Sequence, residues 1–444
     1  MTTADQWLDT APAHWTRGRI KDLLSSATNG TWGSDPTQDG DNVRCVRAAD
    51  FDRISRRADL SNAPLRYVEP SSLRQHLLRP GDLILEKSGG GEKQPVGMAV
   101  LFTGIDKAVC SNFCARIKPS ANVDSRFLTY VFAVAYGQGL TEAAIKQTTG
   151  IQNLDTAALF TSRWAYPAQA EQRRIADFLD AHTAQIDRLR ALTQRQIELV
   201  QERFGEQMRQ WTTGKSDEEI ETRVPWMPRV NAGWGLSRIG YEFRTSSGTT
   251  PTSSRADYFD GPYPWVNSSD IKDAPVLSSG KHVSAEALTD FSALKICRAG
   301  SLVVALYGQG TTKGRVGLLQ MDAYLNQACC ALTSLGRVSE KFAFYWFRAH
   351  KEGIVAQAVG AGQPNLSQET IRQLKIPVPD ADTQHKIVTA LSKKEEKLRT
   401  HSSLLQRRDT LLAECRQALI TAAVTGQFDV STASGRNVTE GVAV

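Results

Sequence analysis

The 444-residue sequence has no apolar run long enough to cross a bilayer, and its N-terminus lacks the basic-then-apolar order of a signal peptide. We therefore expect a cytoplasmic protein with no membrane partner. Apolar residues make up 41% and charged residues 23% of the chain, which is ordinary for roughly two to four soluble globular domains. The formal net charge of +6 permits a nucleic-acid partner without requiring one.

Motifs for metal binding and catalysis are also missing from the sequence. The seven cysteines form no CxxC pair and no histidine pair accompanies them, which favours free thiols in a reducing compartment over a metal site. There is no Walker motif, no GxGxxG, no Asn/Asp-Pro-Pro-aromatic methyltransferase motif and no obvious nuclease cluster. The seven histidines are scattered, and nothing marks one as part of a triad. We therefore expect a chain without catalytic activity and without a cofactor of its own.

The sequence does contain an internal repeat. One set of residues recurs 212 residues later and another recurs 219 residues later, so the two copies differ by a net seven residues in their interiors. A fixed frame around two diverged interiors suggests one scaffold that presents two different reading surfaces. The recurring pairs are Pro167 and Pro379, Gln172 and Gln384, Ile175 and Ile387, Leu179 and Leu391, Trp15 and Trp234, Arg19 and Arg238, Ile20 and Ile239, Gly81 and Gly300, and Leu83 and Leu302.

Two stretches, 168–212 and 382–425, predict long helices. Both lack proline and are rich in Gln, Glu, Arg, Leu and Ala, and each would span about 40 residues or about 60 Å. The second has a leucine every seven residues, and the first carries the same stripe in the same phase. Gly214 and Gly426 follow the last turns, where we expect left-handed caps. The predicted seam residues are Ile175, Leu179, Ile186, Leu189, Val200, Ile387, Leu391, Leu398, Leu405, Leu412 and Leu419.

Several seam positions carry polar side chains, and these indicate which helix each long helix packs against. Such side chains are unfavourable inside a homodimeric zipper, but two unequal helices of one chain can accommodate them. We therefore expect an intramolecular antiparallel coiled coil. An amphipathic helix on a globular core and a parallel homodimeric zipper are the alternatives. The polar seam residues are His182, Gln196, Lys394 and Arg408.

The segments 15–163 and 234–374 contain short apolar runs broken by Gly, Pro, Asn and Ser. Such runs are typical of strands in a mixed α/β domain, and we expect strands at 83–85, 96–100 and 302–306. Two further apolar runs fit either a helix or a buried strand, and we favour helix. These runs are 127–132 and 342–347.

Polar loops at 87–94 and 308–315 lie between expected strands in the two copies. Their glycines expose backbone N–H groups, and their Thr, Gln, Lys and Arg side chains offer donors suited to phosphates and base edges. A solvated hairpin loop is the alternative. Residues 247–270 interleave aromatic and small polar residues, which suits either a groove or ordinary packing. The basic run 44–57 gains meaning only if DNA is the partner. The candidate DNA contacts are Arg44, Arg47, Lys87, Lys93, Gln94, Thr249, Thr250, Trp265, Asn267, Ser268, Gln309, Thr311, Thr312, Lys313 and Arg315.

The order of these motifs resembles the specificity subunit of type I restriction–modification enzymes, over essentially the whole chain. The second interior carries most of the resemblance, and the first keeps the junction at 150–154 but lacks the Lys-Gly-Arg of the second. The segments that carry it are 247–251, Pro264-Trp265, Ser269-Asp270, 300–303, 313–317, Asn326-Gln327, 363–367, 376–379 and 420–426.

This resemblance implies an α+β chain in which two mixed α/β target-recognition domains alternate with two helical spacers. Each domain would read one half of a split, asymmetric sequence in double-stranded DNA, and the paired helices would fix the gap between the halves. The helices would also dock two methyltransferase (modification) subunits, to which ATP-dependent restriction subunits can attach. S-adenosylmethionine, ATP and Mg²⁺ would belong to those partners. The expected boundaries are 1–164 and 215–375 for the recognition domains, 165–214 and 376–430 for the spacers, and 431–444 for a flexible tail.

Two other classes of function remain as alternatives. One is a non-catalytic scaffold whose helices bind proteins and whose globular domains bind peptides without DNA specificity. The other is a nuclease or methyltransferase with a diverged site.

Overall fold

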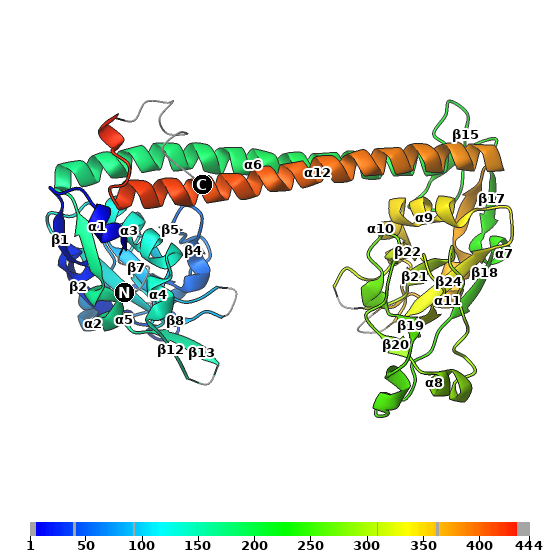
Figure 1. Cartoon of the computed structure of the whole chain (residues 1–444), viewed down its shortest axis with the longest axis horizontal. Helices are drawn as coiled ribbons and strands as arrows, with labels where there is room; N and C mark the ends of the chain where they lie inside the picture. Colours follow the sequence, from blue (N-terminus) through cyan, green and yellow to red (C-terminus); the bar gives the residue numbers. More distant parts are fainter. Residues whose placement is uncertain are drawn as a thin grey trace. The chain divides into compact units, whose positions relative to one another are not determined.

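The computed structural model describes residues 6–38, 41–91, 94–148, 150–308, 310–360 and 364–432. It divides into two compact units: the first comprises Met1–Gln194 and Gln406–Val444, and the second comprises Arg195–Leu405. Each unit is a mixed α/β fold completed by parts of both long helices (Figure 1). Within the described ranges, no helix has the length and apolar character that a membrane span needs.

The first unit is built on a six-stranded sheet in the order β2-β11-β7-β9-β5-β4, with smaller sheets β10-β3-β6, β12-β13-β8 and β1-β14. The strand β10 pairs with β3 in parallel, across the chain between them. The strands are β1 (Thr16–Arg19), β2 (Leu24–Asn29), β3 (Asn42–Val46), β4 (Phe51–Asp52), β5 (Arg57–Ala58), β6 (Leu65–Tyr67), β7 (Leu83–Glu86), β8 (Ser88–Gly89), β9 (Ala99–Leu101), β10 (Ala108–Cys110), β11 (Cys114–Pro119), β12 (Ile145–Thr148), β13 (Ile151–Leu154) and β14 (Arg163–Tyr166). The helices are α1 (Gln6–Thr10), η2 (Ile20–Leu23), η3 (Ala48–Asp50), α2 (Pro70–His76), α3 (Ser125–Gly137), α4 (Leu140–Ala143) and α5 (Thr156–Thr161).

The second unit repeats this plan with the sheets β18-β24-β21-β22, β20-β19-β23 and β17-β25, and adds the pair β15-β16. Here β19 and β23 form the parallel pair. The strands are β15 (Glu219–Glu221), β16 (Arg229–Asn231), β17 (Gly235–Arg238), β18 (Phe243–Ser247), β19 (Tyr263–Val266), β20 (His282–Val283), β21 (Leu302–Ala305), β22 (Val316–Leu318), β23 (Tyr324–Leu325), β24 (Cys329–Ser334) and β25 (Lys375–Val378). The helices are α7 (Ile239–Glu242), η4 (Ala256–Phe259), η5 (Ser268–Asp270), α8 (Ala285–Asp290), α9 (Glu340–Ala349), α10 (Lys351–Val355) and α11 (Gln368–Gln373).

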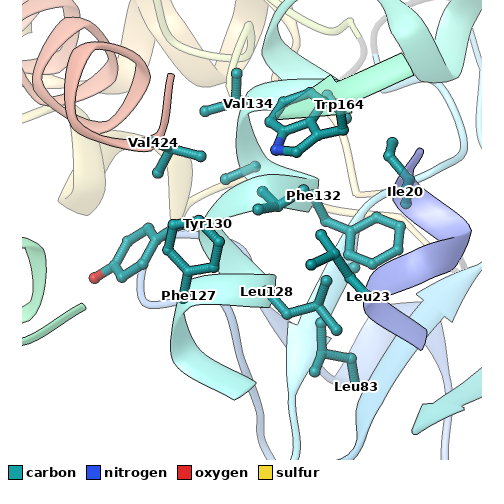
Figure 2. Close-up of a cluster of buried hydrophobic side chains, with 14 of the residues drawn as sticks. Ile20, Leu23, Leu83, Phe127, Leu128, Tyr130, Phe132, Val134, Trp164 and Val424 are labelled. Atoms are coloured by element: carbon teal, nitrogen blue, oxygen red, sulfur yellow. The ribbon is translucent and has the colours of Figure 1, made fainter. Parts of the chain in front are cut away.

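A largely apolar helix lies in the core of each unit, α3 in the first and α9 in the second. Nine of the 13 residues of α3 and seven of the ten residues of α9 are buried, including the whole apolar run of each. Each begins at a side-chain cap, Asp124 for α3 and Ser339 for α9. Figure 2 shows Phe127 and Phe132 of α3 among the buried apolar side chains of the first unit. The helix expected at 127–132 and at 342–347 is therefore confirmed.

The repeat read from the sequence is also present in the tertiary contacts. In each unit the repeated glutamine near the start of the long helix, Gln172 or Gln384, donates from Nε2 to the carbonyl of the preceding repeated proline, at 2.9 and 2.8 Å. Its Oε1 accepts from the backbone N–H at the start of the central helix, from Asp124 at 3.0 Å and Ser339 at 2.9 Å. The repeated residues thus join the long helix to the core of each unit.

The two long helices are α6 (Gln169–Thr213, 45 residues) and α12 (Ala381–Val424, 44 residues), as expected. Gly214 and Gly426 follow them with φ of 67° and 75°, the predicted left-handed caps. A Cβ on Gly214 would lie 2.5 Å from the Trp234 ring, and a Cβ on Gly426 would lie 2.3 Å from Pro12 and 3.2 Å from Trp15. The repeated glycines therefore leave room for the start of each repeated module.

The helices α6 and α12 pack against each other in opposite directions. In the first unit Arg190 Nε lies 2.9 Å from Asp409 Oδ1, and Arg416 Nε lies 2.9 Å from Asp187 Oδ1. The second pair lies nearer to the N-terminus of α6 and nearer to the C-terminus of α12 than the first pair, so the two helices are antiparallel. The predicted intramolecular antiparallel coiled coil is confirmed.

One row of the predicted seam is buried or half-buried, and the other is displaced by one residue on α6. Leu189 is wrong as a seam residue because its side chain is 51% exposed, whereas Arg190 turns towards α12. Ile197 is buried in the same displaced row, at seven residues from Arg190. On α6, each residue of the second row therefore lies four residues after a residue of the first row instead of three. As a result Arg190, which pairs with Asp409, occupies the interface position predicted for Leu189. Of the remaining predicted seam residues, Ile175, Leu179, Leu391, Leu405 and Leu419 are buried, and Ile186, Val200, Ile387, Leu398 and Leu412 are half-buried.

The cysteines are all free thiols. Six are buried and Cys415 is exposed. Burial raises the pKa of Cys45 to about 11 and that of Cys330 to about 12, so these thiols stay protonated at neutral pH. In the part of the chain that the structure describes, no group of three or more His, Cys, Asp or Glu residues is placed to hold a metal ion.

Candidate nucleic-acid interface

The two polar loops occupy equivalent places in the two units. One connects β7 to β9, and the other connects β21 to β22, and both strand pairs are antiparallel neighbours within the main sheet. The loops therefore extend from the same edge of the repeated scaffold, as the sequence predicts.

In the second unit the loop is held partly by its own cationic side chains. Arg315 Nη2 donates to Thr311 Oγ1 at 2.7 Å, and Lys313 Nζ donates to the carbonyl of Pro364. Lys351 Nζ donates to Thr311 O at 3.3 Å. Lys313, Arg315 and Thr312 are half-buried and Thr311 is exposed, so the loop remains open to a ligand. Gln309 lies outside the described residues.

The segment 249–270 divides into core and surface. Trp265 is only 3% exposed, and its indole N–H donates to Thr249 O at 3.1 Å. Its ring packs with Tyr258 and Val283, so we leave Trp265 out of the proposed contacts. Half-buried positions around it carry hydroxyl and amide groups. They are Thr249, Thr250, Asn267 and Ser268.

Asn267 and Thr250 have local hydrogen bonds that position them. Asp270 Oδ2 accepts from the Asn267 backbone N–H at 2.9 Å, which fixes the corner between β19 and η5. Thr250 Oγ1 donates to Gln327 Oε1 across the neighbouring turn. The side chains at this corner are therefore ordered by their neighbours before any ligand arrives.

In the first unit the predicted basic residues are largely tied to the protein. Arg44 Nη1 donates to Ala63 O at 2.8 Å, and Lys87 Nζ donates to Asn29 Oδ1 at 2.8 Å. Arg47 contacts Asp50 through Nε at 2.9 Å and Nη2 at 2.8 Å. These side chains are half-buried, Gln94 is exposed, and Lys93 lies outside the described residues.

The basic run also contains a buried guanidinium. Arg56 is 8% exposed, and burial lowers its pKa to about 10. Its Nε and Nη1 have no hydrogen-bond partner. Arg56 is therefore part of the interior, and the run 44–57 is not a continuous basic surface.

The structure adds a pocket of about 480 Å³ in the first unit that our interpretation of the sequence missed. It is lined by Trp32 and Phe113, whose side chains are 37% and 50% exposed, together with Arg47 and Glu86. Its residues come from four separated segments, so no local pattern marks it. One signal was available, because Gly30-Thr31 before Trp32 repeats the Gly248-Thr249 of the second copy.

A repeated α/β unit with unlike side chains on equivalent surface positions defines a duplicated recognition scaffold. The chain belongs to the family described as the type I restriction modification DNA specificity domain, whose model matches residues 12–199 and 231–407.

Two curated relatives are specificity subunits of type I restriction enzymes. The type I restriction enzyme MjaIX specificity subunit of Methanocaldococcus jannaschii is 21% identical over 178 residues, which is 39% of this chain and 40% of that protein. The EcoR124I/EcoR124II specificity subunit of Escherichia coli is 25% identical over 150 residues, 33% of this chain and 37% of that protein. The chain thus aligns with about two fifths of the length of these relatives.

Solved structures share the fold over nearly the whole chain. A chain from a type I R-M system, solved in work on complex assembly and conformational transition, has a TM-score of 0.72 at 17% identity and covers 94% of this chain and 99% of that chain. The HsdS subunit from Thermoanaerobacter tengcongensis has a TM-score of 0.52 at 16% identity, covering 94% and 98%.

Proposed function

We propose that this chain is the non-catalytic, sequence-reading subunit of a type I restriction–modification complex, and that each unit reads one half of a split DNA target. The observation that carries this proposal is the repeat itself. The hydrogen bonds of Gln172 and Gln384 are the same in both units, whereas the exposed positions around the polar loops differ. Two domains that recognise two different half-sites require the same scaffold with different surface side chains.

The two surfaces offer different chemistry to DNA. The second unit presents hydroxyl and amide groups beside Lys313 and Arg315, whose N–H donors suit phosphates and guanine edges. The first unit presents Arg47 and Lys87 near exposed aromatic side chains. Because the surfaces are unlike, the proposed target is asymmetric.

Affinity and discrimination would come from different contacts. Lys and Arg contacts to phosphates supply binding that weakens as salt rises. Base-edge hydrogen bonds contribute about 1–3 kcal/mol of discrimination for each good bidentate pair. Two readers in one chain add an effective-concentration gain once the first half-site is bound, provided that the spacing between half-sites fits.

We also propose that the long helices dock two methyltransferase subunits, which would carry S-adenosylmethionine. Exposed leucines on the long helices include two pairs that the repeat relates: Leu192 and Leu411 lie in the first unit, and Leu199 and Leu404 lie in the second. The 212-residue repeat relates Leu192 to Leu404 and Leu199 to Leu411. Two equivalent apolar pairs favour a partner present in two copies, and ATP and Mg²⁺ would belong to restriction subunits attached to that partner.

Selection from a random-sequence duplex library tests the reading function. We expect the purified full chain to enrich two short, unlike blocks separated by a fixed number of unspecified base pairs, with retention that falls as salt rises. A protein-binding scaffold would enrich nothing, and an enzyme would turn over DNA with Mg²⁺ or S-adenosylmethionine alone. Either result would contradict the proposal.

A further inference from the structure

The pocket in the first unit lies where three strand ends meet. Its walls come from the corner between β3 and η3, the end of β7, and the turn before β11. Trp32 and Phe113 supply exposed aromatic surface, and Glu86 and Asn112 supply polar atoms. Arg66 lies 4.7 Å from the centre of the Trp32 ring and supports it from the side.

One oxygen of the Glu86 carboxylate is a buried acceptor without a hydrogen bond. The residue is 3% exposed, and its Oε2 has no hydrogen-bond partner. Arg53 forms an ion pair with this carboxylate, but its Nη2 is 3.8 Å from Oε2, beyond hydrogen-bond length. Oε1 lies beside Gly89, another residue of the pocket wall. Buried polar groups are normally paired, so an orphan carboxylate at a pocket indicates a missing partner.

Burial raises the pKa of Glu86 above its usual value, and the nearby Arg53 guanidinium acts in the opposite direction. A carboxylate left without donors behaves in this way.

The second unit shows that the scaffold does not need this carboxylate. The strand register pairs Glu86 with Cys114 in the first unit and Ala305 with Cys329 in the second. These positions are therefore equivalent, and the second copy of the fold is built with alanine at the place of Glu86.

Backbone hydrogen bonds extend this equivalence to the other walls of the pocket. The N–H of Ser111 donates to Val46 O at 2.9 Å, as the N–H of Asn326 donates to Val266 O at 3.1 Å. In the same way Thr31 N–H donates to Cys110 O and Thr249 N–H donates to Leu325 O. The pocket residues Trp32, Arg47, Asn112 and Phe113 thus correspond to Thr250, Asn267, Gln327 and Ala328. The framework is retained and every one of these wall residues is changed, as expected for positions that set specificity.

The chemistry of the walls selects the occupant. A carboxylate accepts hydrogen bonds and cannot donate when ionised, so it fits an amino group and rejects a carbonyl oxygen. Cytosine and adenine both present an amino group in the major groove, but adenine also presents the N7 acceptor, which repels a carboxylate, so a carboxylate favours cytosine N4. Aromatic walls add apolar contact with the base edge and exclude water, which strengthens the hydrogen bond.

We propose that Glu86 is a specificity-determining residue of the first unit, accepting a hydrogen bond from the exocyclic amino group of cytosine in the pocket walled by Trp32 and Phe113. This inference rests on the proposed DNA-reading function and assigns one base of one half-site.

The experiment compares four full-length chains in the random-duplex selection: wild type, Glu86→Gln, Glu86→Ala and the control Glu69→Gln. Glu69 is an exposed residue that does not line the pocket. We expect wild type and control to require cytosine at one position of one half-site. Both Glu86 variants should lose that preference by about 5- to 150-fold, with the other half-site unchanged. Melting temperatures are measured in parallel, and both Glu86 variants should melt at or above the wild-type temperature because Glu86 Oε2 is buried without a hydrogen bond.

The outcomes separate this inference from the proposal on which it rests. If wild type enriches two blocks and the Glu86 variants enrich the same bases at every position, the inference is overturned and the DNA-reading function stands. A lower melting temperature with unchanged base preference assigns Glu86 a structural role and also overturns it. If wild type enriches no sequence, the DNA-reading function fails first.

Discussion

Leu179 and Leu189 are both predicted seam residues of α6, but because the second row is displaced, replacing each with alanine should change stability by very different amounts. Leu179 is fully buried in the first unit, whereas Leu189, ten residues later on α6, is 51% exposed. Replacing a fully buried leucine with alanine costs about 2–5 kcal/mol, because both the transfer energy and the cavity contribute. An exposed leucine away from such a site changes stability by about 0.5 kcal/mol or less.

Thermal unfolding of the full chain measures this difference. For a unit of roughly 150–250 residues, each kcal/mol lowers the melting temperature by about 2–4 °C, so Leu179→Ala should lower the transition of the first unit by about 4–20 °C. Leu189→Ala should lower it by about 2 °C or less. The matched control is Leu391→Ala, which occupies the equivalent buried position and should affect the transition of the second unit instead. Equal losses from Leu179→Ala and Leu189→Ala would refute the displaced seam.

Three further predictions concern the second unit and the helices. Lys313→Ala or Arg315→Ala should weaken reading of one half-site, which gel shifts on half-site variants would show; equal loss at both half-sites contradicts it. Burial lowers the pKa of His350 from about 6.5 to about 3, so the folded state holds it neutral. The stability that it contributes is present above about pH 6.5 and is lost as pH falls towards 3, and His350→Gln should flatten that part of the urea-unfolding profile; an unchanged slope contradicts this. Leu192→Glu with Leu404→Glu should reduce methyltransferase-subunit binding in a pull-down while the melting temperature stays within about 2 °C, and undiminished binding would contradict the docking proposal.

Local sequence patterns predicted the parts of the fold that local physics determines. The length and caps of α6 and α12 follow from helix-favouring composition and from Gly214 and Gly426. The apolar runs of the central helices fit either a helix or a buried strand by length, and helix is the interpretation that the structure confirms. The second seam row did not follow, because three-residue and four-residue steps both keep a stripe on one side of a helix. The partner decided between them through Arg190 and Asp409, which lie 219 positions apart.

The candidate interface shows the same limit. Aromatics among polar residues suit a groove and predict Trp265 as a contact, yet β19 is buried on both faces at its end, and the Trp265 ring packs in one apolar cluster while Val266 packs in another. The pocket around Glu86 could not be predicted, because Trp32, Glu86 and Phe113 meet only through the sheet order. When the two copies are aligned along their paired strands, the wall residues of the pocket differ from their equivalents in the second unit, which indicates a role in specificity.

The first unit takes core residues from α12, which follows the second unit in the chain, and this has a consequence for synthesis. Leu419, Ile420 and Val424 of α12 are buried among the side chains of the first unit, where Val424 lies near Val134 (Figure 2). During translation, all of residues 195–405 are therefore synthesised before these α12 side chains. The first unit is the first to be synthesised, but it can complete its core only after the second unit has been synthesised. A protein truncated near residue 405 would contain all residues of the second unit but would lack the α12 residues of the first.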